Sequence, residues 1–116
     1  MPLRIQNQTR DTLLGEAIEV ADTSAARRVG LLRHRSLEPG RGLWIVPSEA
    51  VHSFGMKFAI DVIFLDRKRK VRKLTPGMAP RRIAICWTAH SILELPVGTI
   101  LATRTEPGDQ LAFEKV

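Results

Sequence analysis

The chain has 116 residues and a net charge of +6, and apolar residues make up 44% of it. Domains cluster at roughly 100–150 residues, so we expect a single domain over residues 1–116. The apolar content argues against a disordered chain. The first residues are polar within a few positions, and no window approaches the roughly 18 apolar residues of a membrane span. We therefore expect a cytoplasmic protein that does not contact a membrane.

Two further totals bear on partners and compartment. The positive net charge favours an anionic partner, although the placement of the charges matters more than their sum. Cys86 is the only cysteine, so no internal disulfide can form, which fits a reducing compartment. The fold must therefore be held by packing alone.

Short strands dominate the expected secondary structure. Alternation of apolar and polar residues predicts strands at 3–7 and 16–21, and the N-cap candidates of 22–24 predict a helix over 23–33. Further strands are predicted at 43–46, 58–65, 70–74, 82–87, 91–95 and 110–113, with a loop around Pro76-Gly77 and a helical turn within 97–103. Strands at this spacing predict a mainly β fold, a compact sandwich or half-barrel with one or two short helices. An α+β label is the alternative.

The segment 58–65 is apolar on both pleat faces except at Asp61. We expect a central strand that is covered on both sides. A carboxylate in such a strand needs hydrogen-bond donors. We therefore expect Asp61 to be structural, with His52, Arg27 or Arg28 as its donors.

Four motifs occur in order along the chain. They are RRVGLL at 27–32, HSFGMKFAIDVIFLD at 52–66, ILELPVG at 92–98 and Gly108-Asp109. Together they cover roughly residues 16 to 113 and resemble the domain of unknown function 192 (DUF192) family of bacterial and archaeal proteins. The resemblance implies a β-rich single domain and no established activity.

The chain departs from that family pattern at three positions. Arg69 stands where the pattern usually carries glycine, so we expect a different type of turn, because a left-handed backbone costs other residues about 1–2 kcal/mol. His34 stands where arginine is favoured, and Leu32 where methionine is common. The last change alters little in a core.

Polar residues embedded in apolar sequence mark the candidate site. Glu94 interrupts the apolar run 92–95, and His52 precedes Phe54 and Met56. We expect His52, Met56 and Glu94 to line a shallow cleft that binds a ligand. The first hypothesis is thus a non-enzymatic binding or accessory module for a small molecule or a protein. A rival is a hydrolase or isomerase that uses His52 with Asp61 or Glu94. The sequence contains no nucleophile–base pair, phosphate-binding loop or cofactor motif, so it identifies neither catalytic residues nor a cofactor.

A basic hairpin follows the central strand. Its charged residues are Arg67, Lys68, Arg69, Lys70, Arg72 and Lys73. Such a cluster is typical either of a phosphate-binding surface or of a solvated hairpin whose charges protect a sheet edge. Aromatic residues for base stacking are scarce, so the alternative function is a non-specific RNA or DNA binder.

A metal site is not indicated by the spacing of the candidate ligands. His34, His52, His90 and Cys86 form no close metal-binding pattern. The apolar neighbours Ile85 and Trp87 suggest that Cys86 is a buried thiol that acts as a small hydrophobe. We therefore expect neither a metal nor a nucleophilic cysteine.

Overall fold

The computed structural model describes residues 2–116, in which seven strands form one curled sheet and two form a separate ribbon. The strands are β1 (Leu3–Asn7), β2 (Thr12–Ala21), β3 (Arg41–Ile45), β4 (Ala50–His52), β5 (Ile60–Leu65), β6 (Val71–Met78), β7 (Ile83–Ile85), β8 (Ser91–Pro96) and β9 (Leu111–Lys115), and the helices are α1 (Ser24–Val29) and α2 (Thr99–Thr103). The large sheet has the order β6-β5-β8-β3-β2-β1-β9, and β4 pairs with β7. Strands β2 and β3 run parallel, while the other paired strands run antiparallel.

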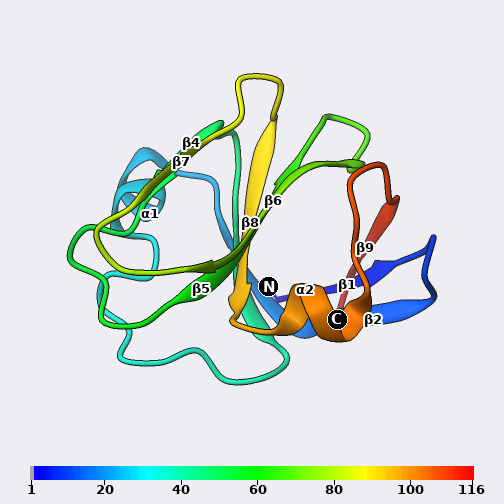
Figure 1. The fold of residues 1–116 in the computed structure, drawn as a ribbon, viewed down its shortest axis with the longest axis horizontal. Helices are drawn as coiled ribbons and strands as arrows, with labels where there is room; N and C mark the ends of the chain where they lie inside the picture. The colour runs from blue at the N-terminus through cyan, green and yellow to red at the C-terminus, as the bar shows by residue number, and fades with distance from the viewer. Residues whose placement is uncertain (1) are drawn as a thin grey trace.

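The sheet curls into a half-barrel whose edge strands β6 and β9 meet at one end (Figure 1). Lys70 forms an isolated bridge with Gln110. The Val71 N–H donates to the Asp109 carbonyl at 2.9 Å, and the Leu111 N–H donates to the Arg69 carbonyl at 3.0 Å. These contacts protect part of both edges. The order of the strands confirms the expected mainly β single domain with a half-barrel sheet.

Two apolar clusters lie on the two faces of the sheet. Ile63 and Leu65 belong to the cluster inside the half-barrel, whereas Ile60, Val62 and Phe64 belong to the cluster on the outer face. Figure 1 shows α1 and the β4–β7 ribbon on that outer side, to the left of β8 and above β5. Every residue of β5 is buried, as predicted for a strand that is covered on both sides.

The helix and strand bounds differ from the predicted ones where backbone geometry intervenes. Helix α1 ends at Val29 because Gly30 takes φ 49°, which helical residues do not adopt. Strand β6 runs through Pro76-Gly77, where a loop was expected; it is an edge strand of the large sheet, and edge strands tolerate proline. Strand β4 was missed because it has three residues and pairs with β7.

No helix among residues 2–116 is long and apolar enough to cross a bilayer.

Candidate functional site

Glu94 lies on β8, in the middle of the large sheet. It pairs with Leu43 of β3 on one side and with Val62 of β5 on the other. Its neighbours Leu93 and Leu95 point into the half-barrel, so strand alternation directs Glu94 to the outer face, under α1. Only 2% of the residue is exposed. An acidic side chain is therefore buried on an interior strand of the large sheet.

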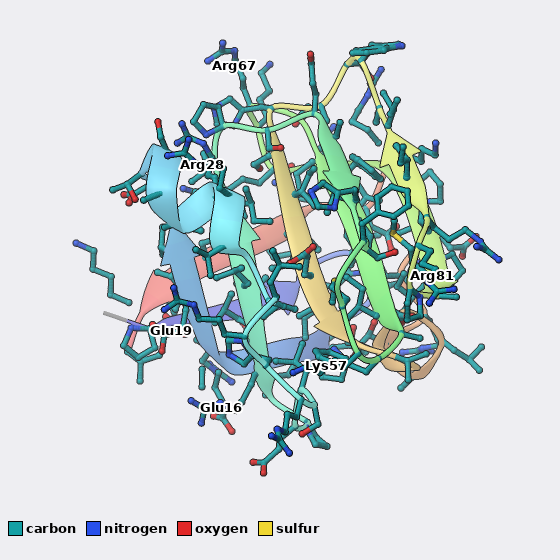
Figure 2. The ribbon with its side chains drawn as sticks, turned by 90° about the vertical axis from the view of Figure 1, so that its left-hand side faces the viewer. Glu16, Glu19, Arg28, Lys57, Arg67 and Arg81 are labelled. Atoms are coloured by element: carbon teal, nitrogen blue, oxygen red, sulfur yellow. The ribbon has the colours of Figure 1, made fainter. Side chains whose placement is uncertain are left out.

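A cavity of about 400 Å³ lies above this carboxyl, between α1, the end of β3 and β4. Its lining includes Arg27, Arg28, Gly30, His52, Met56 and Glu94. The three residues expected to share a cleft, His52, Met56 and Glu94, are thus brought to one cavity. Figure 2 looks onto this face of the molecule, with Arg28 on α1. A ligand role for the three residues is still a prediction.

Gly30 shapes the roof over the carboxyl. Its N–H donates to the Ala26 carbonyl at 2.9 Å and closes the last turn of α1, and its φ and ψ are 49° and −125°. A side chain is strained in that conformation, and an added Cβ would lie 3.9 Å from Glu94 Oε1. The glycine therefore turns the chain directly above the acid and leaves room next to it.

The Glu94 carboxyl lacks the partners that usually accompany a buried acid. Its Oε1 is buried and has no hydrogen-bond partner within residues 2–116. Burial raises the pKa of Glu94 to about 7, because desolvation disfavours the charged form. Near neutral pH the protonated and ionised forms are both populated. The protonated carboxyl can donate a hydrogen bond to a group that enters the cavity, and the carboxylate can accept one from it.

The basic residues that line the same cavity differ in whether their side chains are held by hydrogen bonds to the protein. The Arg27 Nη1 donates to the Asp22 carbonyl at 2.9 Å and to the Val46 carbonyl at 3.3 Å, so this side chain ties α1 to the end of β3. Arg28 is exposed and makes no hydrogen bond or ion pair with the rest of residues 2–116. His52 is exposed too, and its ring centroid lies 5.8 Å from that of Phe54. The cavity thus has an acid at its buried end and two exposed basic side chains on its lining.

Ser53 holds the loop that follows His52, a role that was not predicted from the sequence. It is fully buried. Its Oγ donates to the Ala79 carbonyl at 2.6 Å and accepts from the Arg82 N–H at 2.9 Å. These bonds hold the segment between β4 and β5 against the segment between β6 and β7. The only signal for this role in the sequence is its place inside the motif at 52–66.

The donors expected for Asp61 were wrong. Its carboxylate accepts hydrogen bonds from the backbone N–H groups of Gly77 at 2.9 Å, Gly98 at 3.1 Å and Ile100 at 2.8 Å. The reason is strand alternation: Asp61 faces the inside of the half-barrel, toward α2, while His52 and the α1 arginines lie on the outer side. An acid–base pair of His52 with Asp61 is not formed, and Asp61 instead ties β6 and α2 to β5.

Arg69 keeps the left-handed backbone that glycine would supply, against the expectation of a different turn. Its φ is 65°, and its N–H donates to the Asp66 carbonyl at 3.0 Å. The guanidinium carbon lies 4.3 Å from the ring centroid of Phe113 and 5.4 Å from that of Trp44. Cation–π contacts of this kind offset part of the backbone strain. Arg69 is therefore packed against the half-barrel and does not form part of a free basic surface.

The other residues of the basic hairpin divide between a groove and the sheet. Arg67, Lys68 and Arg72 line an open groove of about 750 Å³ together with His90. The Lys73 Nζ donates to the Ile85 carbonyl at 2.8 Å and so ties β6 to β7. Lys70 is exposed beside the bridge to Gln110. In Figure 2, Arg67 projects outward beyond α1. Of the six basic residues of the hairpin, three thus line one groove.

Comparison with known proteins gives one family and one fold. A family model described as DUF192, "Uncharacterized ACR", matches residues 5–113. A UPF0127 protein of Thermococcus sibiricus is 33% identical over 113 residues, covering 93% of this chain and 73% of the relative. A UPF0127 protein of Pyrococcus abyssi is 32% identical over 116 residues, covering 94% and 96%.

Two solved structures share the fold at low sequence identity. A protein of unknown function from Novosphingobium aromaticivorans superposes with a TM-score of 0.82 at 19% identity, covering 97% of this chain and 84% of that one. A protein described as a putative transcription regulator from Sinorhizobium meliloti gives 0.83 at 22% identity, covering 96% and 91%. At these identities the likeness establishes the half-barrel architecture alone.

Proposed function

The chain belongs to the DUF192 family, and we propose that it is a non-enzymatic binding module whose small-molecule ligand enters the cavity above Glu94. The observation that carries the proposal is a buried carboxyl with an unpartnered oxygen at the end of a cavity of about 400 Å³. Cavities of roughly 300–1,000 Å³ with a few convergent polar groups hold small ligands. Burying a polar oxygen without a partner costs about 1–3 kcal/mol, and a ligand that bonds to it recovers that cost.

The arrangement favours binding over catalysis. Catalysis by acid and base would need a nucleophile or a second titrating group placed against Glu94. The ionisable side chains that line the cavity within residues 2–116 are Arg27, Arg28, His52 and Glu94. Neither a hydroxyl nor a thiol nucleophile is hydrogen-bonded to His52 or Glu94 in that part of the chain.

A screen of small polar compounds by two-dimensional amide NMR tests the proposal. A ligand of the cavity should give saturable shifts in residues 27–32, 52–56 and 92–96, which surround it, and should leave 66–72 unchanged. Arg67→Ser is the matched control, because Arg67 lines the hairpin groove and is not among the residues that line the cavity. If no class of compound gives saturable shifts in the three segments, the cavity is not a ligand site and the proposal fails.

A second candidate rests on the hairpin groove. Arg67, Lys68 and Arg72 line it, and its large opening suits a phosphate backbone better than an enclosed ligand. The acidic residues Glu49 and Asp66 lie in the same lining and weaken the attraction. We therefore rank non-specific nucleic-acid binding second, with the salt dependence of binding as its test.

A further inference from the structure

The inner end of the cavity calls for a cationic hydrogen-bond donor. Glu94 is the only acidic residue among those that line it within residues 2–116, and no donor of that part of the chain reaches its Oε1. The strands on either side present Leu43 and Val62 at the paired positions, which offer no charge. A carboxylate buried in this way is best stabilised by a charge-assisted bond from an N–H donor.

The outer part of the cavity calls for an oxyanion. Arg28 of α1 and His52 of β4 line it and are exposed, and Arg28 has its guanidinium uncommitted within residues 2–116. The planar fork of an arginine matches carboxylate and phosphate oxygens. Arg27 is held by two backbone carbonyls, so it adds positive charge without reaching freely for a ligand.

The surface between these ends is apolar. Leu31, Ile45 and Met56 are buried residues that line the same cavity. A short hydrocarbon or ring would therefore lie between the two charged ends.

From this distribution of charge we propose that the ligand of the cavity is a small zwitterion, with an ammonium or amidinium group against Glu94 and a carboxylate or phosphate toward Arg28 and His52. The inference rests on the proposed binding function and adds the class of ligand. A simple cation would meet the repulsion of the two arginines, and a simple anion would bond to Glu94 only while the carboxyl holds its proton.

The proposal has a consequence for protons. Burial alone holds the pKa of Glu94 at about 7, and a bound cation would lower it, so binding near or below neutral pH releases a proton from Glu94 to solvent. Affinity should then rise with pH until the carboxyl of the free protein is ionised. Apart from the two arginines, His52 is the other ionisable group that lines the cavity within residues 2–116. His52→Gln therefore serves as a control, because it leaves Glu94 as the group whose proton is measured.

Four matched series of compounds test the class of ligand by calorimetry and amide NMR. They are ω-aminoalkanoates of increasing chain length, the corresponding ω-aminoalkyl phosphates, the unsubstituted alkanoates, and the alkylamines. The aminoalkanoates or aminoalkyl phosphates should bind in the cavity most tightly, and the better of the two series identifies the oxyanion. Glu94→Gln should weaken that binding by about tenfold or more, since bonds to charged groups contribute more than neutral ones, and should abolish proton release. Arg67→Ser, which leaves the cavity lining intact, should change neither.

The results separate the two levels of the claim. If alkanoates or alkylamines alone bind as tightly as the zwitterions, or Glu94→Gln leaves affinity and proton release unchanged, the zwitterion is wrong while the binding function stands. If none of the series, nor any neutral compound of the wider screen, gives saturable shifts around the cavity, both claims fall together. Thermal melting of Glu94→Gln confirms that a loss of binding is not a loss of fold.

Discussion

Raising the pH through neutrality should destabilise the folded protein through Glu94. The ordinary pKa of a glutamate is 4.5, and burial raises that of Glu94 to about 7. Between these values the unfolded chain has lost the proton that the folded chain still holds. The free energy of unfolding therefore falls as pH rises across this interval, and the loss is complete above the folded pKa. At about 1.4 kcal/mol per pKa unit, the full loss is ~3 kcal/mol.

Glu94→Gln isolates this contribution, because glutamine has a similar shape and does not titrate. Urea unfolding from about pH 4 to about pH 8 should show a falling stability for the wild-type protein and a flatter curve for the variant. The other ionisable groups are present in both proteins, so their contributions cancel in the difference. Glu16→Gln, at an exposed position of β2 (Figure 2), should follow the wild-type curve. A difference curve for Glu94→Gln that stays flat would show that the carboxyl is not desolvated, and would remove the main support for the binding site.

Three further predictions concern the fold and the hairpin. Phe64→Ala should lower the free energy of unfolding by ~3–5 kcal/mol in a denaturant titration, because the side chain is fully buried in the outer cluster; a loss below about 1 kcal/mol would place it at the surface. Asp61→Asn should cost about 2–4 kcal/mol by the same titration, since an amide cannot accept all three backbone bonds, and an unchanged stability would contradict the structural role. If the hairpin binds nucleic acid, replacing Arg67, Lys68 and Arg72 with Ser should reduce the slope of log affinity against log salt by roughly two to three; an unchanged slope, or no binding at low salt, removes that candidate.

Most of the strands could be predicted from the sequence, because the pleat imposes a period of two on the residues of each strand. The run around 58–65 showed one polar residue among apolar ones, and the structure has β5 buried on both faces. The same pattern marked Glu94 as a polar residue in apolar surroundings, and its side chain is buried. Burial of this kind depends on the nearest neighbours along the chain, so local sequence was enough to predict it.

The partners of the embedded acids could not be read from local sequence. Asp61 takes its hydrogen bonds from residues 16, 37 and 39 positions away, because β6 and α2 fold back onto β5. A backbone N–H is present at nearly every residue, so no side-chain pattern singles out which ones will donate. The sequence suggested charged donors, and only the path of the chain shows that amides supply the bonds.

Tertiary structure also decided which residues of the candidate site and of the hairpin lie together. Whether Glu94 shares a cavity with His52 depends on β4 pairing with β7 and on Gly30 turning the chain after α1. Arg69 looked like one member of a basic cluster, but closure of the half-barrel brings Trp44 and Phe113 beneath its guanidinium. Sequence by itself determined that β5 and Glu94 are buried, since an apolar run along one strand is a local pattern. Contacts between distant segments were decided by the curl of the sheet, because the meeting of β6 and β9 sets which strands face one another.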